Sequence, residues 1–328
     1  MIETPDRNLA FDLAHVTETA AMAAARWQGR GDKEGVDRAA VDAMRAILAS
    51  IDIDGVVVIG EGEKDEAPML FNGERVGNGN GPEVDIAVDP IDGTTLSAQG
   101  MPGALAVIAM AERGSMYSPG SVVYMDKIAV GPAAAGKIDL DAPVEHNLHV
   151  VADARGKDIN DLTAIILDRP RNAKYIDAVR RVGGRIRLIR DGDISGAISA
   201  ADEATGIDIL LGVGGSPEAV IAAAALTCMG GEIQARLWPR DDSERQYALD
   251  NGLDLDTVLT QRDLVRSNNV FFAATGVTTG EFLQGVEFFG DGARTHSVVM
   301  RSKTGSVRSM HARHDFTRLR KISALVYD

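Results

Sequence analysis

The chain has 328 residues, of which 45% are hydrophobic and 25% charged, and it carries a net charge of −14. This composition is typical of a globular protein with roughly two domains, or with one large α/β unit in two halves, and the acidic balance argues against a broad nucleic-acid-binding surface. No apolar run reaches the ~18 residues of a membrane span. The lack of a signal sequence and the single cysteine, Cys228, predict a cytoplasmic protein with no disulfide framework and no membrane partner.

The first half of the chain, residues 1–155, is expected to be an α+β unit. Two amphipathic helices are predicted first, one from Asp6 to about Trp27 and the other over about 34–50. Strands follow at 56–59, 84–89, 104–112 and 121–130. Because no strong helix signal separates the last two strands, we expect a largely antiparallel sheet.

In the second half, residues 156–328, strands and helices alternate. Strands at 162–168, 185–190 and 207–212 precede helices at 172–182, 192–201 and 216–229, which implies parallel strands joined by right-handed crossovers. The remaining elements are predicted as a strand at 232–237, a helix at 241–251 and strands at 268–275, 295–302 and 305–312. We therefore expect an α/β (α+β) fold of five layers, α-β-α-β-α, with two tightly packed halves.

The stretch from Val84 to Thr95, Val-Asp-Ile-Ala-Val-Asp-Pro-Ile-Asp-Gly-Thr-Thr, carries the strongest chemical signal. Its apolar and acidic residues predict a buried strand, and Pro90 should end that strand at Asp89. A tight turn there would gather Asp89, the Ile91 carbonyl and Asp92 around one point. This is the hard oxygen set that Mg²⁺ or Mn²⁺ takes. The alternative is an Asp-rich turn whose side chains bond their own backbone.

Other residues are placed to join this turn. Gly93 permits close backbone approach, and Thr94 supplies a hydroxyl beside the carboxylates. Asp37, near the start of the second helix, and Glu61, after the strand at 56–59, can converge on the same cleft. Because massed carboxylates repel one another, a shared site predicts bound divalent cations.

A second set of polar residues follows the strands of the second half, at the ends where open α/β sheets bind ligands. The set comprises Asp168-Arg169-Pro170-Arg171, Asp191-Gly192-Asp193 and Gly212 to Glu218. Ser216 should cap the following helix with Pro217 at its first position, and the glycines let backbone amides approach a phosphate. The two arginines could clamp a phosphate. Glu218 is either a metal ligand or only a favourable charge at the helix start.

Asp89-Pro90-Ile91-Asp92-Gly93-Thr94 resembles the signature of the metal-dependent, lithium-sensitive sugar and inositol phosphatase superfamily. Together with Gly29 to Lys33, Val58 to Glu63, Ala67 to Leu70 and the motifs of the second half, it makes nearly the whole chain similar to the class II (GlpX-type) fructose-1,6-bisphosphatases of bacteria. The resemblance implies the five-layer sandwich of that superfamily. It also implies hydrolysis of fructose 1,6-bisphosphate to fructose 6-phosphate and phosphate in gluconeogenesis, and a homo-oligomer, either a dimer or a tetramer. Some photosynthetic members also cleave sedoheptulose 1,7-bisphosphate.

The resemblance implies roles for individual positions. Asp37 and Glu61 would bind one Mn²⁺ or Mg²⁺ ion, and Asp89, Asp92 and Glu218 a second, so most ligands come from the first half. Thr94, Asp92 and Glu61 would carry the catalysis. The residues contacting the sugar bisphosphate would be Asp92, Gly93, Thr94, Tyr124, Arg169, Pro170, Arg171, Asp191, Gly192, Asp193 and Gly215.

The expected reaction is attack of water on the 1-phosphate, with two cations polarising the phosphoryl oxygens and Thr94 orienting or deprotonating the water. One alternative is another phosphatase of the superfamily, acting on inositol monophosphate or a nucleotide 3′-phosphate. A dinucleotide-binding dehydrogenase is disfavoured, because Gly212-Val213-Gly214-Gly215 lacks the Gly-x-Gly-x-x-Gly spacing. A catalytically silent metabolite sensor would keep the metal site and differ only in turnover.

Overall fold

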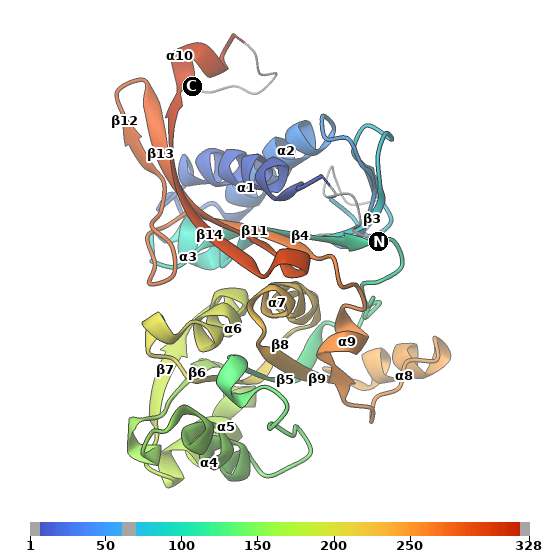
Figure 1. Ribbon diagram of the computed structural model, residues 1–328, viewed down its shortest axis with the longest axis vertical. Coiled ribbons are helices and arrows are strands. Elements are labelled where there is room, and N and C mark those ends of the chain that lie inside the picture. The colour runs from blue at the N-terminus through green and yellow to red at the C-terminus, as the bar shows by residue number, and fades with distance from the viewer. Residues whose placement is uncertain (1–6, 61–69, 322–328) are drawn as a thin grey trace.

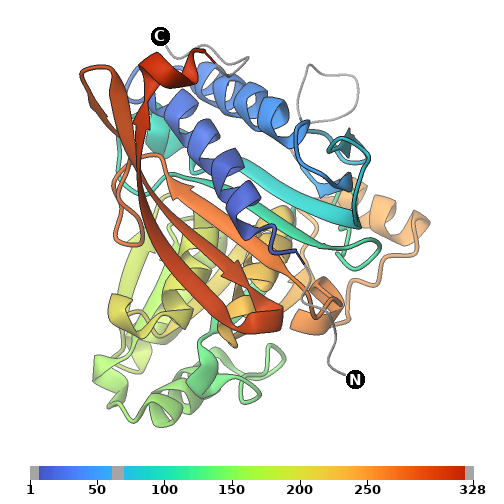
Figure 2. The same ribbon diagram turned by 45° about the horizontal axis from the view of Figure 1, so that its top comes forward.

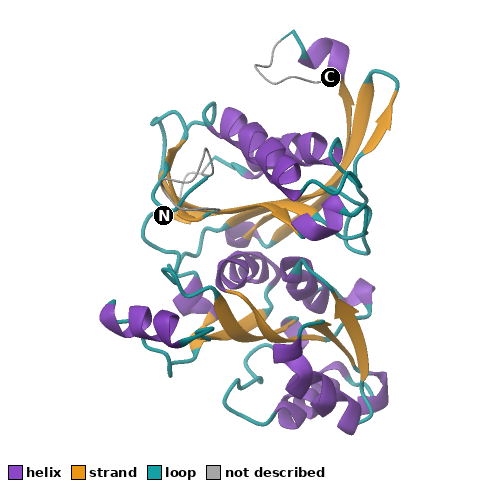
Figure 3. Cartoon of the chain, turned by 180° about the vertical axis from the view of Figure 1, so that it is seen from behind, coloured by secondary structure: helices purple, strands orange, loops and turns teal. Residues whose placement is uncertain are grey.

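The computed structural model describes residues 7–60 and 70–321 and stacks its elements in five layers, α-β-α-β-α (Figure 1 and Figure 3). Helices α1 (Ala10–Ala25) and α2 (Lys33–Leu48) form the first layer. Helices α6 (Asp193–Ala201) and α7 (Ser216–Met229) lie between the two sheets, and α4 (Val144–Arg155) and α5 (Ala173–Arg181) cover the far face of the second sheet. The predicted fold class is confirmed.

Within the described residues, the first sheet has eight strands in the order β12-β13-β11-β4-β3-β1-β2, and β14 also pairs with β13. Every pair is antiparallel except β1 with β3. The strands are β1 (Asp54–Ile59), β2 (Arg75–Val76), β3 (Glu83–Asp92), β4 (Leu105–Glu112), β11 (Phe271–Gly276), β12 (Glu287–Phe289), β13 (Gly292–Arg301) and β14 (Ser306–Asp315). Figure 2 shows β13 and β14 as a long curved hairpin beside the helices of the first layer.

The second sheet, as far as the chain is described, has six strands in the order β10-β9-β5-β8-β6-β7. They are β5 (Tyr124–Val130), β6 (Thr163–Leu167), β7 (Arg185–Ile189), β8 (Ile209–Gly215), β9 (Glu232–Leu237) and β10 (Leu259–Thr260). Strand β6 pairs in parallel with β7 and β8, as the β-α alternation predicts. Strand β5 is antiparallel to both of its neighbours.

The sheets do not follow the order of the chain. Strand β5, expected in the sheet of the first half, lies instead within the second sheet, and both sides of β4 are paired with β3 and β11. Strands β11 to β14 return from the end of the chain to the first sheet. Each sheet therefore draws strands from both sides of residue 155.

The two helices of the first layer begin differently. The Asp32 carboxylate caps α2 by accepting a hydrogen bond from the Gly35 N–H at 2.9 Å. Helix α1 begins at Ala10 without a side-chain cap, and Asp6, which the sequence predicts as its cap, lies outside the described residues. Alanines make up much of α1 and are almost all buried, so the helix packs closely against α2, β11 and β13.

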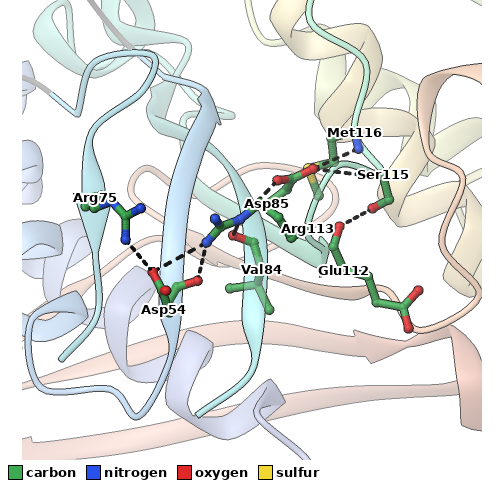
Figure 4. Close-up of polar contacts among 8 residues, drawn as sticks. All are labelled: Asp54, Arg75, Val84, Asp85, Glu112, Arg113, Ser115 and Met116. Atoms are coloured by element: carbon green, nitrogen blue, oxygen red, sulfur yellow. Dashed lines mark hydrogen bonds and ion pairs between the residues drawn. The ribbon is translucent and has the colours of Figure 1, made fainter. Parts of the chain in front are cut away.

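A polar network anchors β3 at its first residues (Figure 4). The buried Asp85 carboxylate accepts hydrogen bonds from the backbone N–H groups of Ser115 and Met116, at 2.9 and 3.1 Å. Arg113 donates to the Val84 carbonyl at 3.1 Å. Because Ser115 and Arg113 directly follow β4, these contacts tie the two strands together, and the opposite end of β3 enters the site described below.

Apolar clusters fill the spaces between the layers. Helix α7 lies between the sheets and buries Ala219 to Leu226 completely, which explains why this stretch has no polar face. The shorter elements are α3 (Thr94–Ala98), α8 (Asp242–Asp250), α9 (Gln261–Leu264), α10 (Phe316–Leu319) and 3₁₀ turns at Pro132–Ala134, Ile159–Asp161, Pro170–Asn172, Glu203–Thr205 and Ser302–Thr304. Within the described ranges, no helix combines the length and apolarity that crossing a membrane requires.

Candidate functional site

Strand β3 does not end at Asp89, as the sequence predicts, but continues to Asp92. Its register against β4 shifts between these two residues. Such a bulge leaves one residue out of the ladder, so Pro90, which has no N–H, is accommodated without ending the strand. The Asp89 carboxylate accepts a hydrogen bond from the Ile91 N–H at 3.1 Å, which is the local backbone contact expected of an Asp-rich turn.

Thr94 connects this turn to the second helix. Gly93 adopts a left-handed conformation, φ 90°, and α3 begins directly after it. The Thr94 Oγ lies 2.9 Å from Asp37 Oδ1 and 3.1 Å from the Ile91 carbonyl. Asp37 comes from the start of α2, and its pKa rises to about 6, chiefly because the carboxylate is buried and partly because Asp191 is near. The structure therefore brings Asp37 and Thr94 together.

The second sheet contributes two loops to the same place. Between β7 and α6, Gly192 is left-handed, φ 78°, and Asp193 begins the helix. Between β8 and α7, Gly215 is the N-cap of the helix, so the predicted cap at Ser216 is wrong by one residue. The extended backbone of Gly215 meets the N-cap requirement, and the Ser216 hydroxyl is buried without a hydrogen-bond partner among the described residues.

Four carboxylates from the two sheets form an acidic cluster, which we define as Asp92, Asp191, Asp193 and Glu218. Asp92 is only 3% exposed, and its Oδ2 has no hydrogen-bond partner within the described residues. Burial, followed by repulsion from Asp193, Glu218 and Asp191, raises the pKa of Asp92 well above its usual range. Burial and the Asp193 charge likewise raise the pKa of Glu218, to about 7. The acidic cluster thus holds more negative charge than its surroundings balance.

Lys127, whose role is not predicted from the sequence, is a cation that the structure places against the acidic cluster. Its Nζ lies 2.7 Å from Asp193 Oδ2, and the two side chains are 3% and 5% exposed. The same Nζ donates to the Gly215 carbonyl at 2.9 Å, so Lys127 joins both loops of the second sheet. A charged residue within the otherwise apolar end of β5 is the sequence signal that could have revealed it.

A cavity of about 310 Å³ adjoins the acidic cluster. Among the residues that line it are Tyr124, Arg169, Arg171, Asp191, Gly192, Asp193, Gly215 and Glu218, all of them predicted site residues. Pro170, predicted with them, opens the 3₁₀ turn that carries Arg171 but does not line the cavity.

Arg171 is held in place before any ligand arrives. Its guanidinium lies 4.2 Å from the centre of the Tyr124 ring, and its Nε donates to the Val213 carbonyl at 3.1 Å. The next residue, Asn172, is fully buried and bonds both the N–H and the carbonyl of Val213, at 2.7 and 3.2 Å. Asn172 therefore fixes the arginine turn to β8, a role that the sequence analysis also misses.

Comparison with known proteins identifies the family. The family profile described as bacterial fructose-1,6-bisphosphatase, glpX-encoded, matches residues 7–314 of the chain. The chain belongs to this family. The family that the sequence motifs resemble is thereby confirmed as the family of this chain.

Similar curated proteins agree with this membership. Two proteins of Synechococcus, strains JA-3-3Ab and JA-2-3B'a(2-13), are named D-fructose 1,6-bisphosphatase class 2/sedoheptulose 1,7-bisphosphatase. Each is 42% identical to this chain, over 94% of it and 96% of its own length. Fructose-1,6-bisphosphatase 1 class 2 of Escherichia coli (strain K12) is also 42% identical, over 94% of this chain and 95% of its own length.

The acidic cluster suits a hard divalent cation. Buried carboxylate oxygens are the donors that Mg²⁺ and Mn²⁺ take, and the unpartnered Oδ2 of Asp92 is left for such a partner. Glu61, a predicted ligand, lies outside the described residues. Among the described residues, no group of three or more acidic, histidine or cysteine side chains already forms a metal cage. The two cations and the ligand roles of Asp37, Asp89, Asp92 and Glu218 stay predictions.

Proposed function

We propose that this chain hydrolyses the 1-phosphate of fructose 1,6-bisphosphate, giving fructose 6-phosphate and phosphate. Membership of the fructose-bisphosphatase family supports the reaction. The observation that carries the proposal is the position of the acidic cluster beside a cavity with two arginines. A substrate with a phosphate at each end can place one phosphate at the acidic cluster and the other phosphate at the two arginines.

Mn²⁺ or Mg²⁺ is the cofactor proposed for the reactive end. Asp37 and Glu61 would hold one ion, and Asp89, Asp92 and Glu218 a second. Bound there, the ions would neutralise charge on the transferred phosphoryl group and lower the pKa of the attacking water. Without a cation, these carboxylates would repel the anionic substrate.

Thr94 orients the attacking water in this mechanism. Its hydroxyl lies between the Asp37 carboxylate and the Ile91 carbonyl, at 2.9 and 3.1 Å, so its direction is set by two fixed acceptors. The Thr94 hydroxyl passes its own proton to Asp37 Oδ1, 2.9 Å away, as it takes one from the water, so the carboxylate finally holds the proton that the water releases. Asp92 and Glu61 complete the proposed catalytic set.

The end of the cavity that carries Arg169 and Arg171 recognises the 6-phosphate. Arg171 is held by the Val213 carbonyl and the Tyr124 ring, so little side-chain entropy is lost when it pairs with phosphate oxygens. Arg169 adds a second guanidinium. Asp191 lines the cavity and accepts bonds from sugar hydroxyls, whereas Asp193 is already paired with Lys127 and holds its loop in place.

Sedoheptulose 1,7-bisphosphate is a second candidate substrate. The two Synechococcus relatives carry this activity in their names. The sugar is one carbon longer, so its far phosphate reaches further into the cavity. Inositol monophosphate, the alternative substrate from the same superfamily, has a single phosphate and would leave the arginines unused. The proposal also includes that the protein forms a homo-oligomer and that it is located in the cytoplasm.

Phosphate release from a panel of sugar phosphates tests this function. We expect fructose 1,6-bisphosphate to be cleaved, with no turnover in EDTA and restored turnover in Mn²⁺. Asp92→Asn should abolish release, whereas the matched control Asp153→Asn, an exposed carboxylate on α4, should leave it unchanged. Equal turnover with and without EDTA would contradict the metal chemistry, and preferred cleavage of inositol monophosphate would contradict the substrate.

A further inference from the structure

A second cavity, here called the rear cavity, lies between the two sheets and holds about 350 Å³. Its walls are mostly apolar and come from both sides of the molecule. The first-sheet side supplies Leu96, Met101, Pro102, Leu105, Phe282 and Leu283, and the second-sheet side supplies Ile165, Leu188 and Ile189. Clefts of this size between packed units are typical of small-molecule sites.

The rear cavity is separate from the substrate cavity but touches the same residue. Asp191 lines both spaces, and it is the only described residue to do so. Leu96, on the opposite wall, belongs to α3, the helix that begins at the predicted catalytic Thr94. A ligand in the rear cavity would therefore lie directly behind the proposed reactive site and touch both sheets at once.

The charged groups around the rear cavity favour an anion. Arg190 lines the cavity, is exposed, and makes no ion pair with any described residue; its Nη1 lies 3.9 Å from the Met101 Sδ on the opposite wall. Arg187 also lines the cavity, but it already pairs with Glu281 from the facing loop. The carboxylate of Asp191 also lines the rear cavity, but its charge acts on Asp92 and Glu218 of the acidic cluster. Arg190 is thus a lining arginine without an ion pair among the described residues, beside an apolar space.

We propose that the rear cavity binds a small amphipathic anion, with an apolar or aromatic body and one carboxylate, sulfonate or phosphate group. The apolar walls remove the body from water, and Arg190 pairs with the anionic group. The established family membership does not account for this site, because the substrate of the proposed function is a sugar bisphosphate with no apolar body.

Occupancy of the rear cavity also regulates turnover, a consequence that rests on the proposed function. The ligand bridges α3 and the 280–283 loop on one side to β7 and α6 on the other. It therefore fixes the placement of Thr94 relative to Asp191, and this changes the KM for the sugar bisphosphate.

The fluorescent probe 8-anilinonaphthalene-1-sulfonate has the required chemistry and tests binding without any activity assay. Wild type should bind it saturably at one site per chain, and saturating phosphate with Mn²⁺ should not displace it. Arg190→Gln should weaken binding at least tenfold. Ser199→Phe, which fills the cavity from α6, should abolish it. The matched control Arg180→Gln, an exposed arginine of α5 without an ion pair among the described residues, should bind like wild type.

Circular dichroism of each variant shows whether it is folded, since the probe also binds partly folded proteins. If Ser199→Phe fails to fold, the exposed Arg190→Gln still decides the result. Equal binding by Arg190→Gln, Arg180→Gln and wild type would overturn the proposal, as would displacement by phosphate or the absence of saturable binding. A KM for fructose 1,6-bisphosphate that shifts at least twofold with the probe in wild type, but not in Arg190→Gln, supports regulation. Probe binding without any shift would remove the regulatory part alone.

Discussion

Replacing Glu218 with glutamine is expected to stabilise the metal-free protein while abolishing phosphate release. Burial, followed by repulsion from Asp193, raises the pKa of Glu218 from 4.5 to about 7. One pKa unit corresponds to about 1.4 kcal/mol, so keeping this side chain ionised in the folded state lowers the free energy of unfolding by up to roughly 3 kcal/mol. Glutamine keeps the shape of the side chain and removes its charge.

The direction of the pKa shift also sets the pH dependence. The folded protein holds the Glu218 proton more tightly than the unfolded chain does, so this residue contributes most stability below pH 4.5 and loses that contribution as the pH rises through 7. Glu218→Gln should therefore exceed wild type in stability most clearly above pH 7. At pH 4.5 the difference should largely disappear.

Urea unfolding followed by circular dichroism, in EDTA at pH 8 and pH 5, measures this effect. Glu34→Gln is the matched control, because Glu34 also lies in the first turn of a helix but is exposed, so both changes lose a similar helix-dipole interaction. Added Mn²⁺ should reverse the order, since a cation bound only by folded wild type stabilises it. A Glu218→Gln protein less stable than wild type at pH 8 in EDTA would refute the reasoning, as would an equal gain at both pH values.

Three further substitutions test single contacts. Thr94→Val keeps the side-chain shape but removes the hydroxyl beside Asp37. It should slow phosphate release about 100-fold or more and leave the melting temperature unchanged. Near-normal turnover would exclude Thr94 from the mechanism. Lys127→Met leaves Asp193 buried without its partner and should cost about 3–5 kcal/mol in urea unfolding, and an unaltered midpoint would show that the pair does not hold the loops. Arg171→Gln should raise the KM for fructose 1,6-bisphosphate at least tenfold while changing kcat little, and an equal fall in kcat would place the arginine at the reactive end instead.

Periodicity predicts the β-α part of the fold well. The alternation from 162 to 229 corresponds to β6, α5, β7, α6, β8 and α7, because each apolar run there forms a strand and each helix begins close to a glycine, proline or aspartate signal. Periodicity does not show which strands pair. Strand β5 is expected in the sheet of the first half, but its partners, β8 and β9, follow much later in the chain.

The short-range details depend on geometry that a sequence pattern does not contain. A proline normally ends a strand, but the bulge between Asp89 and Asp92 lets β3 continue. Helix α3 is too short, at five residues, to produce a periodic signal. The motif residues Asp92, Asp191, Asp193 and Glu218 can be predicted to meet, because each lies at the end of a strand or shortly after it.

Supporting residues could not be predicted in the same way. Lys127 acts through Asp193 and Gly215, and Asn172 acts through Val213, so their roles arise only when distant strands pair. Lysine and asparagine are usually exposed residues, so residue type alone does not mark either of them as buried. Only their burial, 2% and 0% exposed, distinguishes them.

Anomalous diffraction from crystals soaked in MnCl₂ tests most directly whether carboxylates from both sheets hold cations at one point. Manganese peaks should lie within coordination distance of Asp92 and Glu218, with a further peak beside Asp37. The peak at Asp92 and Glu218 should vanish in crystals of Asp92→Asn that are otherwise unchanged. Ordered wild-type crystals that show these side chains with no manganese between them would contradict the proposed chemistry.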